Sequence, residues 1–108
     1  MLSNTTDQNA PGLTLKAWAF FSPAGTLIKQ QNVSGVVKNS AGNYTVTFAA
    51  ALATATPVVI ARAAQSGGVT NPPFVAVTGI SAAAVTVVCV AVGAQTDPTG
   101  GVWVGCYE

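Results

Sequence analysis

The sequence predicts an all-β domain, an antiparallel β-sandwich of about eight short strands with an extended N-terminal arm. Segments rich in Val, Thr, Phe and Trp recur along the chain, and these residue types favour strands over helices. Clusters of Gly, Pro, Asn and Ser separate the segments, as expected for tight turns between antiparallel neighbours. The chain has 108 residues, which is the size of one domain with one core.

The expected strands follow one another at short intervals. Turn-forming residues occupy 22–25, 39–42 and 97–101. Two Ala-rich stretches, 49–55 and 81–84, have helix propensity but are too short for a stable helix, so we expect connectors there. In chain order the expected strands are Leu15 to Phe21, Thr26 to Gln31, Gly35 to Lys38, Asn43 to Phe48, Pro57 to Ala64, Phe74 to Thr78, Val85 to Val92 and Val102 to Tyr107.

The first 14 residues are polar and lack aliphatic periodicity. Such a stretch contains too little apolar surface to pack by itself, so we divide the chain into an arm at 1–14 and a β-sandwich domain at 15–108. No Lys or Arg precedes Lys16, which argues against a secretory signal peptide or a basic membrane anchor.

Alternation within two strands indicates what is buried. In Asn43 to Phe48, three large side chains share one face, which we expect to line the core: Tyr44, Val46 and Phe48. In Val85 to Val92 both faces are apolar apart from Thr86, so we expect this strand to be covered on both sides.

Charge is scarce along the whole chain. Four Lys or Arg and three Asp or Glu make 6% of the residues, against about 25% in typical soluble domains. The mean hydropathy is +0.50. Seven charges are too few for a normally solvated surface, so we expect other chains to cover much of it.

Composition argues against several classes of function. A net charge of +1 with no basic cluster gives no footprint for nucleic acid. With no His and two Cys, the usual zinc sites and the commonest general base are missing, so we expect no metal, no cofactor and no enzymatic activity. The longest apolar run, 82–94, is too short to cross a bilayer as a helix, and we expect no membrane insertion.

Two sets of side chains allow more than one interpretation. A hairpin centred on Asp97-Pro98 would place Cys89 opposite Cys106, either as a disulfide or as two buried free thiols, and the lack of a secretory signal favours free thiols. Six aromatic residues suit either stacking on sugar rings or packing in the core or a subunit interface, and packing is the commoner role. They are Trp18, Phe20, Phe21, Phe74, Trp103 and Tyr107.

Residues 16–48 contain an ordered set of motifs: a Trp-containing strand at 17–21, a Gly-Thr turn at 25–26, an Asn-Val-Ser strand opening at 32–34 and a Gly-Asn-Tyr-Thr-Val-Thr-Phe hairpin strand at 42–48. In this order the motifs resemble a module of phage tail fibre proteins. The resemblance implies a virion structural protein, assembled in the host cytoplasm, whose β-sandwich forms a homotrimer at or near a tail fibre tip. The arm would then bind other virion proteins.

We therefore expect a trimeric tail fibre or fibre-tip module that contacts the host cell surface. A capsid decoration or head fibre protein and a free carbohydrate-binding module are the alternatives. The two longest polar loops, 66–73 and 94–101, contain no charged residue other than Asp97 and suit hydrogen bonding to a neutral bacterial surface glycan. The expected contact residues are Ser66, Thr70, Asn71, Thr96, Asp97 and Thr99.

Overall fold

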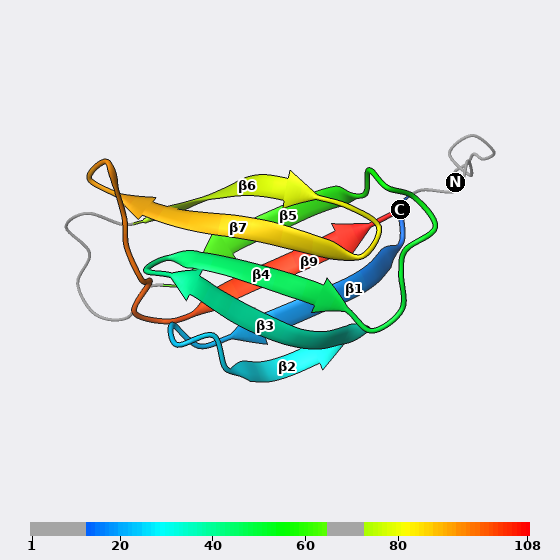
Figure 1. Cartoon of the computed structure of the whole chain (residues 1–108), viewed down its shortest axis with the longest axis horizontal. Coiled ribbons are helices and arrows are strands. Elements are labelled where there is room, and N and C mark those ends of the chain that lie inside the picture. Colours follow the sequence, from blue (N-terminus) through cyan, green and yellow to red (C-terminus); the bar gives the residue numbers. More distant parts are fainter. Residues whose placement is uncertain (1–12, 65–72) are drawn as a thin grey trace, which may run out of the picture.

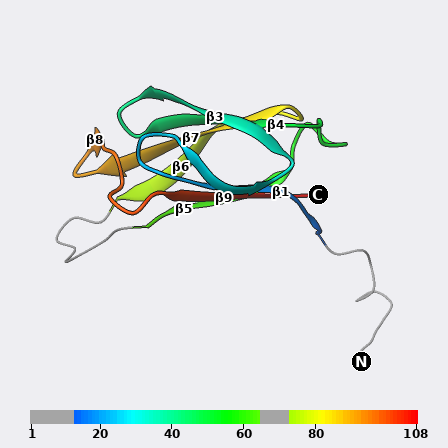
Figure 2. The same cartoon turned by 90° about the horizontal axis from the view of Figure 1, so that it is seen from below.

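A computed structural model describes residues 13–64 and 73–108 of the chain. These residues form two antiparallel sheets that pack face to face, with no helix in either described range (Figure 1). Seen from below, the two sheets appear as two layers (Figure 2). The predicted all-β sandwich is confirmed, and the predicted contact residues at 66, 70 and 71 lie outside the described residues.

Residues 13–64 and 73–108 contain nine strands, and eight of them match the expected segments closely. The additional strand, β8, is a two-residue strand that pairs with the end of β7. Strand β3 also extends beyond its expected bounds and leaves only Ala41 and Gly42 as the turn to β4. The strands are β1 (Leu15–Phe21), β2 (Leu27–Gln31), β3 (Val33–Ser40), β4 (Asn43–Phe48), β5 (Val58–Ala63), β6 (Phe74–Ile80), β7 (Ala84–Ala91), β8 (Ala94–Gln95) and β9 (Val102–Tyr107).

The strand order is β2-β1-β9-β5 in one sheet and β3-β4-β7-β6 in the other, with β8 beside β7. The expected hairpin between the strands of Cys89 and Cys106 is therefore wrong, because β7 and β9 belong to different sheets. The chain leaves β7 through a turn at Val92 and Gly93, whose φ angles are 52° and 75°. Two successive residues with positive φ close a tight hairpin onto β8, so Val92 belongs to this turn and not to the expected strand.

The core lies between the sheets and is entirely apolar among the described residues. Tyr44, Val46 and Phe48 are buried, as predicted. Along β7, the side chains that face the other sheet are buried except Ala91. The opposite side chains lie on the outer face of the sheet, and their expected coverage by another chain remains a prediction.

The Ala-rich stretches are connectors, as predicted, and backbone contacts tie them together. The N–H of Leu52 donates to the carbonyl of Ala82 at 2.8 Å, and Leu52 itself is buried. The Glu108 carboxylate accepts hydrogen bonds from the backbone N–H groups of Ala53 and Thr54, at 3.2 and 3.1 Å. These contacts close the end of the sandwich where β9 finishes.

Candidate functional site

The two sheets differ first in charge. The strands of the β2-β1-β9-β5 sheet contain three of the four basic residues of the chain, Lys16, Lys29 and Arg62, and no carboxylate. The strands of the β3-β4-β7-β6 sheet contain one charged residue, Lys38. Positive charge is therefore concentrated on one layer of the sandwich.

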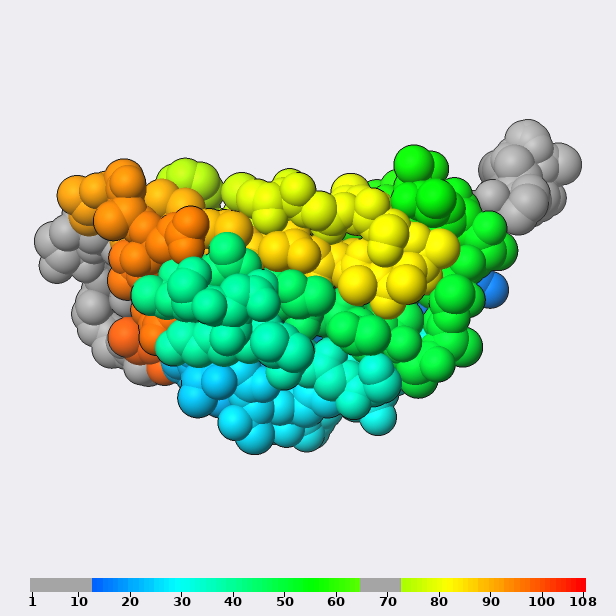
Figure 3. All heavy atoms as spheres, viewed as in Figure 1, coloured from blue at the N-terminus to red at the C-terminus, as the bar shows by residue number. Residues whose placement is uncertain are grey.

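We name the outer faces of the two sheets by their side chains, which alternation and strand pairing place there. The aromatic-cationic face belongs to the β2-β1-β9-β5 sheet and consists of Trp18, Phe20, Lys29, Gln31, Ile60, Arg62, Trp103 and Tyr107. The uncharged face belongs to the β3-β4-β7-β6 sheet and consists of Val37, Asn43, Thr45, Thr47, Phe74, Ala76, Thr86, Val88 and Val90. Figure 3 views the molecule from the side of the uncharged face.

Four side chains of the aromatic-cationic face form one row across the sheet. Lys29 is paired with Phe20, Phe20 with Trp103, and Trp103 with Arg62. Side chains directly opposite one another in antiparallel strands point to the same face and lie in contact range. The row therefore reads cation, aromatic, aromatic, cation from one edge strand to the other.

A pocket of about 400 Å³ opens beside this row. Phe20, Arg62 and Trp103 line it together with Ala63 and Ala64, whose small side chains leave the space open. Arg62 is exposed, and Phe20 and Trp103 are half-buried. The pocket thus combines two aromatic side chains with one guanidinium group, which is a donor that suits carboxylates.

Glycine at 105 permits the position of the Trp103 ring. A Cβ at this position would overlap the six-membered part of the Trp103 indole. The ring therefore lies over the backbone of its own strand, and any side chain at 105 would displace it. The neighbouring row continues with Trp18, whose indole N–H donates to Gln31 Oε1 at 3.1 Å.

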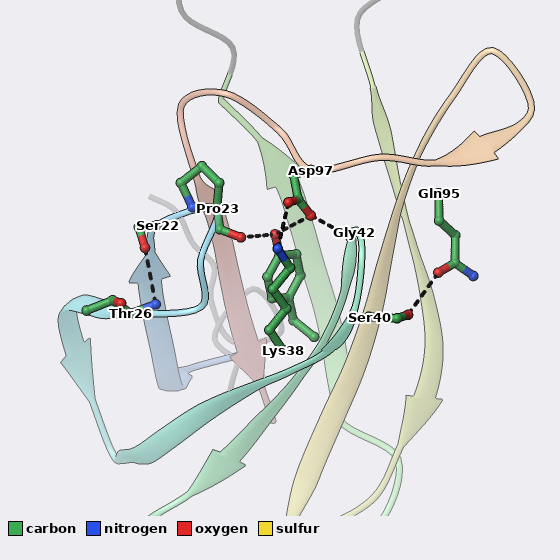
Figure 4. A network of polar contacts seen from close by, with 9 residues as sticks. Ser22, Pro23, Thr26, Lys38, Ser40, Gly42, Gln95 and Asp97 are labelled. Carbon is green, nitrogen blue, oxygen red and sulfur yellow. Dashed lines mark hydrogen bonds and ion pairs between the residues drawn. The ribbon is translucent and has the colours of Figure 1, made fainter.

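Asp97 belongs to a second site of a different kind, a polar cluster at one end of the sandwich (Figure 4). Its carboxylate pairs with the Lys38 ammonium at 2.6 Å and accepts the backbone N–H of Gly42 at 2.7 Å. The Tyr44 hydroxyl lies 3.3 Å from the same carboxylate and 2.6 Å from the carbonyl of Pro23, to which it donates. Asp97 therefore ties the loop between β8 and β9 to the β3–β4 hairpin.

Electrostatics in this cluster follow from the contacts. The hydrogen bond from Lys38 and that from the Gly42 N–H hold the pKa of Asp97 below its ordinary value, against the opposing effect of burial. Burial, followed by the nearby Asp97 charge, raises the pKa of Tyr44. The phenol therefore stays protonated near neutral pH and serves as a hydrogen-bond donor.

The other expected contact residues of this loop are also engaged within the chain. Thr96 donates its backbone N–H to Cys89 at 3.0 Å and its hydroxyl to the Ala94 carbonyl at 3.1 Å. Thr99 is exposed and has an interaction partner of its own. Host contact through this loop remains a prediction, and what the structure assigns to Asp97 is a role in holding the loop.

Both cysteines are buried free thiols, as the sequence favoured. They lie toward opposite ends of the sandwich, Cys89 beside the Gly42 turn and Cys106 beside the end of β9. Burial and then the Asp97 charge raise the pKa of Cys89 to about 11, and burial raises that of Cys106 to about 11. Neither thiol is a reactive thiolate at neutral pH.

Sequence reasoning missed the aromatic-cationic row. A partial signal exists, because Trp18 and Phe20 are two residues apart and so point to one face of a strand. The pairing of Phe20 with Trp103 and of Trp103 with Arg62 joins positions far apart in the chain. Alternation within a strand reveals which residues share a face, whereas only register reveals which rows they complete.

Comparison with known proteins found no matching family model, no matching curated protein and no matching solved structure. Over residues 13–64 and 73–108, no group of metal-ligating side chains gathers. The same ranges contain no helix long and apolar enough to cross a membrane.

Proposed function

We propose that this protein is a phage virion component, a trimeric tail fibre or fibre-tip module. In this proposal the uncharged faces of three copies pack against one another, and the aromatic-cationic faces point outward to the host surface. The single observation that carries the proposal is an outer sheet face without any charged side chain among the described residues.

Exposed apolar side chains on the uncharged face support its role as an interface. Val37 is 57% exposed on β3, and Phe74 is 64% exposed on β6. Between them, the central strands carry Thr and Val, and the hydroxyls of Thr45 and Thr86 are 3.3 Å apart and satisfy each other. Depletion of charge with an aromatic side chain present is typical of subunit interface cores.

The number of subunits and the virion setting rest on the resemblance of residues 16–48 to the tail fibre module. Most soluble oligomers consist of identical copies arranged with closed symmetry. A trimer of this chain agrees with that tendency, because the uncharged face has no charged group that would select a different partner. A chain of 10.8 kDa with 6% charged residues also benefits from burying apolar surface between copies.

One observation favours a second function, that of a free carbohydrate-binding module. The pocket beside Phe20 and Trp103 offers aromatic side chains to a sugar ring. A free module is expected to act as a monomer, whereas the fibre module requires association. The oligomeric state therefore discriminates between the two functions.

Sedimentation of the full chain at micromolar concentration tests the proposal. We expect a mass three times 10.8 kDa, and a clean monomer would overturn the fibre module. Immunogold labelling of purified virions from a phage that carries the gene should mark the fibre, and labelling of the head alone would favour the decoration protein.

A matched pair of variants locates the interface. Phe74→Lys places a charge on the uncharged face, where burying an unpaired ammonium is costly, and should give a folded monomer. Ile28→Lys changes a residue of similar exposure, 54%, on the edge strand of the other sheet, and should remain trimeric. Dissociation by Ile28→Lys but not by Phe74→Lys would mean that the interface lies on the β2-β1-β9-β5 sheet, contrary to the proposal.

A further inference from the structure

We propose that the pocket between Phe20, Trp103 and Arg62 binds a carboxylated sugar unit of an acidic polysaccharide. This inference deepens the proposed function, because it names the ligand class of the outward face, and it rests on the host-surface role given there. It moves the contact from the polar loops to the sheet. The ligand it names is anionic, in contrast to the neutral glycan that the sequence predicts for the loops.

The surrounding charge favours an anion. Among the described residues the one ion pair is Lys38 with Asp97, so no carboxylate of these residues pairs with Arg62. Lys29 stands at the other end of the same row, and the strands of this sheet contain no acidic residue. An anion beside the row therefore meets positive charge from two edge strands and no carboxylate on the strands of this sheet.

The aromatic side chains favour a ligand with an apolar flat side. Phe20 and Trp103 are neighbours across β1 and β9 and line the same pocket as Arg62. A pyranose ring has an apolar side formed by C–H groups that packs on an aromatic ring, and a ring carboxylate can then accept two parallel hydrogen bonds from a guanidinium. Stacking on an aromatic and pairing with Arg62 thus use both features of the pocket at once.

Size and charge together favour a sugar over a nucleic acid. A pocket of about 400 Å³ lies within the range of small-ligand sites, about 300–1,000 Å³. Single-stranded nucleic acid also combines anionic groups with flat rings, but its affinity comes from many phosphate contacts. One guanidinium in the pocket and a chain net charge of +1 provide few such contacts.

Tryptophan fluorescence can report binding at this pocket directly. The chain has two Trp residues, so the Trp18→Phe variant leaves Trp103 as the sole reporter. We would titrate this variant with oligosaccharides of galacturonic acid, of hyaluronan and of polysialic acid, and with the methyl ester of the galacturonate oligomer as the uncharged match. We expect at least one acidic oligomer to shift the Trp103 emission in a saturable way. The methyl ester should bind at least about tenfold more weakly than the acidic oligomer.

Charge variants separate a specific site from general attraction. Arg62→Gln should weaken binding of the acidic oligomer on the order of tenfold, because a charged hydrogen-bonding partner is removed. Lys16→Gln removes the same charge from the same sheet at a residue outside the pocket lining, and should change affinity less than about twofold. Equal weakening by both variants would overturn the pocket.

Three further results would also overturn it. They are no binding of any acidic oligomer, equal binding of the methyl ester, and tighter binding of oligothymidylate than of every sugar. The pocket lies within one chain, so binding should persist in the monomeric Phe74→Lys variant. If the unmodified chain binds an acidic oligomer but sediments as a monomer, the fibre module is refuted and the pocket is kept, whereas an unmodified trimer that binds no acidic oligomer gives the reverse conclusion.

Discussion

The aromatic-cationic face and the uncharged face are built from similar antiparallel strands, yet they differ in what their outer residues can do. Three basic residues and no acid belong to the first sheet, and one basic residue belongs to the second. That one, Lys38, is neutralised by Asp97 at 2.6 Å. Among the described residues, one sheet face thus carries positive charge and the other carries none.

The difference shows that the few charged residues are unevenly distributed between the two sheets. A face without charge is suited to burial against other copies, because no ammonium or carboxylate has to lose its water. A face with aromatic rings, whose cations have no ion-pair partner within the described ranges, is suited to a ligand that neutralises them. One average over the chain, 6% charged residues, conceals both properties.

Both faces depend on the shared core, and the largest expected effect comes from breaking it. Phe48 is buried between the sheets, and Phe48→Ala should lower the free energy of unfolding by about 3–5 kcal/mol. Chemical denaturation followed by circular dichroism measures this loss. An effect below about 1 kcal/mol would mean that Phe48 does not hold the two sheets together.

A charge placed on the uncharged face should make the two faces more alike. Val37→Lys adds an ammonium at an exposed position of β3, so folding of the monomer should change by less than about 0.5 kcal/mol. Association should weaken by several kcal/mol in the proposed trimer, since an unpaired charge is buried there. Sedimentation equilibrium gives the change, and an unaltered trimer would place β3 outside the interface.

Removing the Asp97 carboxylate should leave Lys38 without its ion-pair partner. Asp97→Ala leaves the buried N–H of Gly42 without its acceptor, and should cost about 1–3 kcal/mol of folding free energy. Asp97→Asn keeps an oxygen for Gly42 and loses only the exposed ion pair, so it should cost about 1 kcal/mol or less. Equal losses in the two variants would contradict the role given to the Gly42 contact.

Lowering the pH should weaken the same contact, with a smaller loss of folding free energy than the Asp97→Ala substitution. The pKa of Asp97 is lowered in the folded chain from an ordinary value of 3.8, so folding favours the ionised form. Its contribution is present above pH 3.8 and is lost as the pH falls through the folded-state pKa. Unfolding curves between pH 5 and pH 2 should therefore show a decline that Asp97→Asn reduces, and an identical decline in both proteins would exclude Asp97 as its source.

The smallest effect is expected for the threonine pair of the uncharged face. Replacing Thr45 and Thr86 together by Val removes both hydroxyls of the 3.3 Å contact, so neither is left without a partner. Removing both partners of a hydrogen bond is nearly neutral, and the melting temperature should stay almost unchanged. Thr45→Val alone should be the more destabilising of the two changes, and thermal unfolding of the single and double variants compares them.

Local pattern was sufficient for the elements and for part of the core. Alternation in 43–48 correctly placed Tyr44, Val46 and Phe48 inside, because neighbouring side chains of a strand point to opposite faces. The turn at Val92 was missed, since Val favours strands and its positive φ is set by closure of the hairpin onto β8. Pairing partners were also misjudged where the chain crosses from β7 to β9.

The sequence by itself determined the all-β class, most strand bounds and the buried face of β4, whereas it left open whether the two cysteines form a disulfide. Only the tertiary structure decided that β7 and β9 lie in different sheets, that Asp97 neutralises Lys38, and that Phe20, Trp103 and Arg62 meet at one pocket. The reason is physical. Turn preferences and alternation act over a few residues, whereas the order of strands in a sheet follows from how the whole chain buries its apolar faces in one core.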